Sequence, residues 1–158
     1  MTVTQNTAYT FDTSAFLQCW ARFYPRDVFP GLWERLEGML DRGEIVCPDE
    51  VLNELGKQED DLYNWLKTKK GVFLELDEPI QDAASEVLSD HPFIAKEFAR
   101  RTHADPFVIA VAKVHGLAVV TQEDRGTTNK PRIPFVCDDL GIPCIDVIGF
   151  IREVGWRF

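Results

Sequence analysis

Short continuous runs of apolar residues alternate along the chain with longer segments in which apolar residues recur at helical spacing. The short runs favour buried strands, and a period of about 3.6 residues favours amphipathic helices. The predicted strands cover residues 9–12, 44–47, 72–76, 117–121 and 144–147. The predicted helices cover residues 14–22, 30–42, 48–55, 60–70, a segment opened by Pro79, residues 105–115 and a last segment that runs to Trp156.

Capping residues refine the ends of two of these helices. Ser14 or Thr13 is the predicted N-cap of the first helix, and Asp105 is the predicted N-cap of residues 105–115, with Pro106 at the first position. Apolar residues cover nearly the whole circumference of the 105–115 helix, so we expect it to be buried. The segment 122–134, QEDRGTTNKPRIP, consists of turn formers and charges and is predicted to be a loop.

Strands that are separated by helices of this length imply a parallel sheet covered on both faces. The expected fold class is therefore α/β, a three-layer α/β/α sandwich with a central, mainly parallel sheet. At 158 residues the chain fits one domain, residues 1–158, in which residues 1–8 are expected to form a flexible N-terminal tail.

The composition changes this picture little. Hydrophobic residues make up 45% of the chain and charged residues 27%, which argues against disorder. The first residues lack the positive and apolar regions of a signal peptide, and the longest apolar run, residues 107–112, is too short to cross a bilayer. We expect a cytoplasmic protein without membrane contact. The spacing of the four cysteines matches neither a redox pair nor a zinc site, so we expect reduced thiols.

The charge is unevenly distributed. A net charge of −9 counts against a generic nucleic-acid binder, because it repels phosphate backbones on average. The window 96–132 nevertheless holds seven basic and four acidic residues, so it carries +3. A local interaction of this window with an anion is therefore compatible with the negative net charge of the chain.

Five acids fall where an open parallel sheet gathers its chemistry, beyond the carboxyl ends of the strands. Asp12 ends the first predicted strand, Glu123 and Asp124 follow residues 117–121, Asp105 begins a helix, and Glu54 lies on a helix face that could point along the sheet. Converging carboxylates repel one another strongly. Because no histidine or cysteine cluster suggests zinc, Mg²⁺ or Mn²⁺, which prefer oxygen ligands, would relieve this repulsion better than protonation.

Each acid also has a structural interpretation. Asp105 suits a helix cap, Glu54 suits a solvated helix position, and Asp124 beside Gly126 suits a turn. Asp12 is the hardest to explain structurally. The signal for chemistry is therefore the set of acids and not any single one.

With these positions known, the chain resembles the PIN domain family. The resemblance is carried by FDTSAF, VLNEL, ADPFVIAVAKVHG and VVTQED, in this order over residues 11–124, and also by DVFPGLWERLEGML and the tryptophan-ended C-terminal helix. It implies a PIN-like fold and a metal-dependent endoribonuclease that acts on single-stranded RNA. Such proteins are commonly the toxin of a toxin–antitoxin pair, as in VapC-like proteins.

The resemblance also assigns roles to residues. Asp12, Glu54 and Asp105 match the three acids most characteristic of PIN sites. Glu123 falls where the family often has a fourth acid, usually Asp, and the adjacent Asp124 leaves the identity of the fourth ligand open.

The mechanism that follows is an in-line hydrolysis at phosphorus. Asp12, Asp105 and Glu123 or Asp124 would hold one or two Mg²⁺ or Mn²⁺ ions, with Glu54 as a ligand or as the group that orients the attacking water. The hydroxyl of Ser14, with the neighbouring Thr13, would fix the orientation of the first acid.

The remaining expectations concern partners. The basic residues expected to meet the RNA backbone, or else to be ordinary solvated charges, are Arg100, Arg101, Arg125, Lys130 and Arg132. Any exposed part of the aromatic stretch 20–33, which by default packs in the core, is a candidate contact for an antitoxin or for a homodimer.

Two other functions remain as alternatives. A haloacid dehalogenase-like phosphatase also begins with a strand and an aspartate, but it needs a second Asp two residues later, where this chain has Ser14. A catalytically silent PIN fold could serve as a binding module, and its acidic charge would suit a basic partner.

Overall fold

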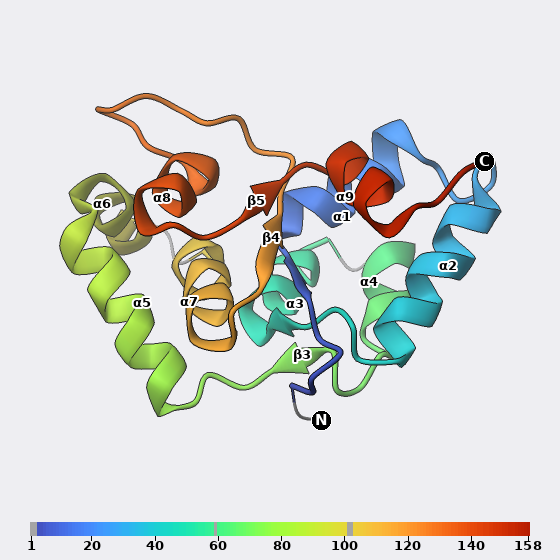
Figure 1. Cartoon of the computed structure of the whole chain (residues 1–158), viewed down its shortest axis with the longest axis horizontal. Coiled ribbons are helices and arrows are strands. Elements are labelled where there is room, and N and C mark those ends of the chain that lie inside the picture. The colour runs from blue at the N-terminus through green and yellow to red at the C-terminus, as the bar shows by residue number, and fades with distance from the viewer. Residues whose placement is uncertain (1–2, 59, 101–102) are drawn as a thin grey trace.

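The computed structural model describes residues 3–58, 60–100 and 103–158, and short parallel strands lie at its centre (Figure 1). The strands are β1 (Tyr9–Phe11), β2 (Cys47–Pro48), β3 (Phe73–Leu74), β4 (Ala118–Val120) and β5 (Cys144–Ile145). The helices are α1 (Thr13–Gln18), which continues into a π-helical segment (Cys19–Phe23), α2 (Pro30–Asp41), α3 (Asp49–Leu55), α4 (Asp61–Leu66), α5 (Glu78–Asp90), α6 (Pro92–Arg100), α7 (Asp105–His115), α8 (Ile133–Leu140) and α9 (Val147–Val154).

Strand β1 lies in the middle of the sheet. On one side β1 pairs with β4, and β4 pairs with β5, so that Phe11, Val120 and Ile145 are in register. On the other side a parallel bridge joins Tyr9 to Ile45, just before β2, and β2 pairs with β3. The spatial order is therefore β3-β2-β1-β4-β5, with all strands parallel.

Helices cover both faces of this sheet. Helices α5, α6, α7 and α8 lie on one side of it, and α1, α2, α4 and α9 lie on the other (Figure 1). Helix α7 contacts β1, β2 and β4, and its apolar residues from Val108 to Ala112 are buried. The prediction that this helix is buried is therefore confirmed. On the opposite face, the ring of Phe150 in α9 packs edge-on against Tyr9 and Phe11, at centroid distances of 4.9 and 5.1 Å.

Two helices were missed from the sequence. Helix α6 is amphipathic, with Phe93, Ile94 and Phe98 among its apolar residues, but its second half falls in the basic window 96–132 and the segment was not recognised as a helix. Helix α8 begins at Ile133, so the loop predicted over residues 122–134 ends at Arg132, two residues earlier than expected. Proline at position 134 suggested a loop, yet in the first turn of a helix its missing N–H costs nothing.

The last predicted strand is shorter than expected. Strand β5 ends at Ile145, and the carboxylate of Asp146 accepts a hydrogen bond from the N–H of Gly149, 2.8 Å away. This N-cap turns the chain into α9 at Val147, so the predicted strand 144–147 was two residues too long.

The residues just before β1 are bonded to the segment that precedes β2. The hydroxyl of Thr7 donates to the carbonyl of Gly43 over 2.7 Å, and the N–H of Ala8 donates to the carbonyl of Glu44 over 2.9 Å.

In the described part of the chain, no helix is both long and apolar enough to cross a bilayer. All four cysteines are free thiols. The flexible tail over residues 1–8 and the single-domain organisation stay predictions.

The packing of α9 on the sheet predicts a large cost for truncating Phe150. This ring is 1% exposed and also packs on Trp156 at 5.4 Å, so Phe150→Ala removes a buried aromatic that typically contributes about 3–5 kcal/mol. We expect the melting temperature, measured by circular dichroism, to fall by roughly 10 °C. Phe23→Ala is the matched control, because Phe23 is 49% exposed. Equal melting temperatures for the two variants would contradict this packing.

Candidate functional site

Polar residues follow the carboxyl ends of the three paired strands in one row. Because β1, β4 and β5 end in register, the next residues, Asp12, Thr121 and Asp146, lie at the same edge of the sheet. Asp12 and Asp146 each also cap the helix that follows, by accepting hydrogen bonds from the N–H groups of Ala15 and Gly149. This edge is where strands end, helices begin and polar groups gather, as the parallel sheet predicts.

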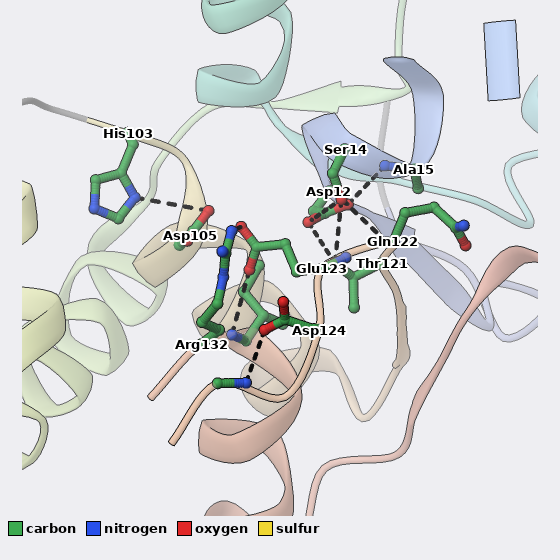
Figure 2. A network of polar contacts seen from close by, with 12 residues as sticks. Asp12, Ser14, Ala15, His103, Asp105, Thr121, Gln122, Glu123, Asp124 and Arg132 are labelled. Atoms are coloured by element: carbon green, nitrogen blue, oxygen red, sulfur yellow. Dashed lines mark hydrogen bonds and ion pairs between the residues drawn. The ribbon is translucent and has the colours of Figure 1, made fainter. Parts of the chain in front are cut away.

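The carboxylate of Asp12 is at the centre of this network and is 2% exposed (Figure 2). It accepts hydrogen bonds from the N–H of Ala15 over 2.9 Å and from the hydroxyl of Thr121 over 2.6 Å. The hydroxyl oxygen of Ser14 lies 2.8 and 2.9 Å from its two oxygens. Burial and then the charge of Glu123 raise the pKa of Asp12 to about 8, against the opposing effect of the hydrogen bonds. The group is firmly oriented, but its ionised form needs a positive charge nearby.

The N-cap of α1 is Asp12, so the prediction that Ser14 or Thr13 caps this helix was wrong. The backbone of Asp12 is extended (φ −83°, ψ 172°), which lets its side chain reach the N–H of Ala15. Ser14 is thereby free to donate to Asp12 and to accept a hydrogen bond from the N–H of Gln122 over 3.0 Å. Thr13 lines the cleft described below, and its hydroxyl is buried without a hydrogen-bond partner among the described residues.

Asp105 is the first residue of α7 and not its N-cap, so this prediction was also wrong. The helix starts one residue earlier than the sequence pattern suggests, because the carbonyl of Ala104 already accepts hydrogen bonds from Phe107 and Val108, each over 2.9 Å. The Asp105 side chain makes no capping contact and instead faces His103, whose Nδ1 lies 3.6 Å from its Oδ1.

Glu54 reaches the same place from α3, where its Oε1 accepts a hydrogen bond from the N–H of Ala104. The electrostatics of His103 show how these acids interact. Burial would lower the pKa of His103, but Asp105, followed by Glu54 and Glu123, outweighs it and raises that pKa. The three carboxylates therefore act on one imidazole.

Glu123 is held against the start of α8 (Figure 2). Its side chain is 14% exposed, with Oε1 at 3.2 Å from Nη2 of Arg132 and Oε2 accepting a hydrogen bond from the N–H of Ile133 over 3.4 Å. Burial and the charge of Asp105 raise the pKa of Glu123, while Arg132 opposes the shift. Glu123 thus belongs to the same electrostatic cluster as Asp12 and Asp105.

Asp124 has different surroundings, at the start of a tight loop. Its exposed carboxylate accepts a hydrogen bond from the N–H of Gly126 over 2.9 Å, which is turn chemistry. Gly126 has φ 74°, and a Cβ there would lie 2.4 Å from the carbonyl oxygen of Lys130. Two backbone hydrogen bonds between Thr127 and Lys130, 3.1 and 3.2 Å long, close the loop. The loop backbone that leads to Arg132 is therefore tightly constrained.

One cleft of about 570 Å³ brings these side chains together. Four predicted acids line it, together with Glu97 of α6, which sequence reasoning missed; the acidic lining residues are Asp12, Glu54, Glu97, Asp105 and Glu123. Asp124 does not belong to the described lining. Acids as far apart in the chain as Asp12 and Glu123 thus converge on one cavity.

Of the five basic residues predicted to bind substrate, some line the cleft and some do not. Lys130 and Arg132 line the cleft. Arg125 and Arg100 lie outside its described lining, and Arg101 lies outside the described residues. The exposed side chains of Arg125 and Arg100 form ion pairs, with Asp138 at 2.6 Å and with Glu97 at 3.0 Å.

Sequence reasoning missed two further residues of the site. Thr121 is buried and donates a hydrogen bond to Asp12; its position at the end of a predicted strand, two residues before Glu123, is the signal that could have found it. Phe93 of α6 lines the cleft and is partly exposed there. No signal pointed to Phe93, because its helix was not predicted.

The acids fit a hard divalent cation in chemistry, although they do not form a ready-made cage. The lining carboxylates offer oxygen atoms, the ligands that Mg²⁺ and Mn²⁺ prefer. Over the residues described, no three His, Cys, Asp or Glu side chains lie close enough together to hold a metal ion. Because Mg²⁺ keeps several waters and binds through one or two carboxylates, the cleft suits a hydrated ion.

In protein freed of divalent metal, the environment of Asp12 predicts that this residue's contribution to folding stability decreases as the pH rises, which is the opposite of the usual behaviour of a carboxylate. Folded Asp12, with its pKa raised to about 8, keeps a proton that the unfolded chain releases near pH 4, so this group's contribution to stability falls as pH rises between the two values. Asp12→Asn removes this loss. We expect the variant to melt several degrees above the unaltered protein at about pH 8, and close to it at about pH 5.

Melting curves in EDTA over this pH range measure the effect. Asp124→Asn is the matched control, because Asp124 is exposed and should leave the pH dependence unchanged. Parallel pH profiles for the unaltered protein and Asp12→Asn would contradict the raised pKa.

Comparisons with known proteins bear on the fold and on the family of the chain. No curated protein matches the chain in sequence. Among solved structures, FitAcB from Neisseria gonorrhoeae is 20% identical with a TM-score of 0.51, over 87% of this chain and 96% of that one. PAE2754 from Pyrobaculum aerophilum is 18% identical with a TM-score of 0.45, over 87% and 97%. The similarity to FitAcB confirms the predicted three-layer, PIN-like α/β/α fold.

A family model covers nearly the whole chain, from residue 9 to residue 158. The description of this family is "Domain of unknown function (DUF4411)". On this match, the protein belongs to the DUF4411 family.

Proposed function

We propose that the protein is a metal-dependent endoribonuclease that hydrolyses single-stranded RNA. The observation that carries the proposal is the convergence of Asp12, Glu54, Asp105 and Glu123, from four separate segments, on one cleft. The resemblance of the same four positions to PIN sites supports it. The raised pKa values of Asp12 and Glu123 support it as well, because such shifts are typical of functional sites.

In this proposal Asp12, Asp105 and Glu123 hold Mg²⁺ or Mn²⁺, and Glu54 serves as a further ligand or orients the attacking water. We choose Glu123 over Asp124 as the fourth acid because Glu123 lines the cleft. When bound, the metal ion supplies charge stabilisation at the phosphate and lowers the pKa of a coordinated water.

The chain's own groups supply positioning. Ser14, Thr121 and the N–H of Ala15 fix the orientation of the Asp12 carboxylate. Lys130, on the constrained loop, would bind the RNA backbone beside the acids. The reaction is an in-line displacement, in which the water oxygen bonds to phosphorus as the bond from phosphorus to the leaving nucleotide oxygen breaks.

The apolar part of the cleft supports a single-stranded substrate. Phe93 is partly exposed in the cleft and is not among the aromatic residues packed against the core. Leu17, Ile94 and Pro131 line the same cavity. An unpaired base can stack on such a ring, whereas a paired base has its faces covered by its neighbours.

We further propose that the protein is the toxin of a toxin–antitoxin pair and acts on cytoplasmic RNA. The aromatic stretch 20–33 is largely packed, since Trp33 is buried and Trp20, Tyr24 and Phe29 pack against the core. Its exposed apolar side chains are Phe23 and Val28, 49% and 62% exposed. These two residues are the proposed contact for an antitoxin or for a second copy in a homodimer.

One observation favours a silent binding module as the second candidate: each of the four acids already has a partner within the protein. The phosphatase alternative loses support, because Ser14 donates a hydrogen bond to Asp12 at the position where a second acid is required. RNA cleavage in Mn²⁺, compared with cleavage in EDTA, separates these functions. Hydrolysis of phosphate monoesters in place of RNA would favour the phosphatase.

Asp12→Asn and Glu123→Gln should each lower metal-dependent RNA cleavage at least about 100-fold, because each removes a negative charge that would hold the cation. The measurement is the initial rate on a labelled single-stranded RNA, with EDTA abolishing cleavage by the unaltered protein. Asp124→Asn, which changes the neighbouring acid outside the cleft, should retain the full rate. Full cleavage by Asp12→Asn would defeat the proposal, and absence of cleavage by any form would favour the silent module.

Phe93→Ala should weaken binding of single-stranded RNA by roughly 5- to 100-fold, because base stacking on an aromatic ring is lost. Fluorescence anisotropy at low temperature, with the RNA verified as intact afterwards, measures the affinity. Phe23→Ala is the control, since Phe23 is an exposed aromatic that does not line the cleft in the described structure. The stacking role would be overturned if Phe93→Ala bound single-stranded RNA as tightly as the unaltered protein does. It would also be overturned if the unaltered protein bound duplex RNA as tightly as single-stranded RNA.

A further inference from the structure

The guanidinium of Arg132 pairs with one carboxylate of the cleft, that of Glu123, where a bound cation could also lie. Nη2 of Arg132 is 3.2 Å from Oε1 of Glu123 (Figure 2). Burial would lower the pKa of Arg132, but Glu123, Asp124 and Asp105 outweigh it and raise that pKa. The charge of Arg132 therefore neutralises part of the acidic cluster.

Glu123 is committed to this arrangement through both of its oxygens. Oε1 pairs with Arg132, and Oε2 accepts the N–H of Ile133 at the beginning of α8. The N–H of Glu123 donates to the hydroxyl of Thr121 over 3.1 Å, so the backbone of Glu123 is tied to the group that also bonds Asp12. A cation at Glu123 would therefore meet the positive charge of Arg132 at the same carboxylate, and binding through Oε1 would require the ion pair to break.

We propose that Arg132 and a divalent cation compete for Glu123, which makes Arg132 a positioning residue that holds the cleft in a metal-free arrangement. This inference rests on the proposed function. It also explains how four acids can line one cleft in a chain whose described residues contain no ready-made metal cage: the cluster is neutralised from within until an ion displaces the guanidinium.

The side chain of Arg132 is free enough to be displaced. It is 48% exposed, whereas its partner Glu123 is 14% exposed, so the arginine side chain has open solvent into which it can rotate. The loop that leads to Arg132 is closed by backbone hydrogen bonds and does not depend on the guanidinium. Release of the ion pair therefore requires rotation of one side chain and no change of the fold.

Calorimetric titration of Mn²⁺ into the RNA-free protein tests the competition. Arg132→Gln removes the competitor and should tighten Mn²⁺ binding by about 2- to 5-fold, the fold-change that corresponds to the upper part of the range for partly exposed ion pairs. Arg125→Gln is the matched control: it removes the same charge from the same loop, but Arg125 pairs with Asp138. It should change the affinity by less than about twofold.

A double-mutant cycle excludes a general electrostatic effect. In a Glu123→Gln background, Arg132→Gln should no longer tighten Mn²⁺ binding. If Arg132→Gln fails to fold, Arg132→Lys retains the charge and shortens the side chain, and it should tighten Mn²⁺ binding to a smaller extent.

The outcomes separate this inference from the proposed function. If the unaltered protein binds Mn²⁺ but Arg132→Gln binds it no more tightly than Arg125→Gln does, only the competition is overturned. If the unaltered protein and all variants fail to bind Mn²⁺, the metal-dependent function and the competition both fall.

Discussion

Mutual repulsion among carboxylates at the end of a parallel sheet is the constraint that shapes this molecule. Asp12 is almost fully buried at the carboxyl end of the central strand, where its negative charge is least favourable. The charge of Glu123 adds to that cost, and the charge of Asp105 in turn disfavours the ionised form of Glu123. Much of the surrounding structure consists of groups that reduce this repulsion, and the chemistry of the cleft follows from how they do so.

The protein opposes the repulsion with hydrogen-bond donors and positive charge from distant elements. The hydroxyls of Ser14 and Thr121 and a backbone N–H stabilise Asp12, the N–H of Ala104 binds Glu54, and Arg132 neutralises Glu123. These contacts orient the carboxylates before any ligand arrives, which reduces the reorganisation that binding would require. The raised pKa values of Asp12 and Glu123 show that the ionised acids remain electrostatically unfavourable as a set.

The amino-acid pattern predicts the fold and the location of two acids well, for identifiable physical reasons. Apolar runs separated by helical periodicity specify a parallel sheet, and such a sheet places the ends of β1 and β4 at one edge. The positions of Asp12 and Glu123 at this edge therefore follow from the order of strands and helices along the chain. Asp105 and Glu54 were also expected near this edge, but from weaker signals, a helix start and a helix face, and the resemblance to PIN domains strengthened their assignment.

The sequence failed where a role depends on exact backbone geometry. Whether Asp12 or Ser14 caps α1 depends on the direction in which the chain leaves the strand. Helix α7 starts one residue earlier than predicted, so its N-cap is Ala104 and not Asp105. The choice between Glu123 and Asp124 depends on the loop around Gly126, whose closed conformation directs one acid into the cleft and the other into a turn. Phe93 and Glu97 lie on α6, a short amphipathic helix whose second half was counted with the basic window 96–132.

The hydrogen bond between Thr121 and Asp12 links residues 109 positions apart in the chain. An N-terminal fragment that stops before β4 contains Asp12, Glu54 and Asp105 but lacks the hydroxyl that orients the first of these acids. During synthesis on the ribosome, the cleft is therefore assembled only after most of the polypeptide has emerged. Incomplete chains carry the acidic residues without the arrangement that would make them a site.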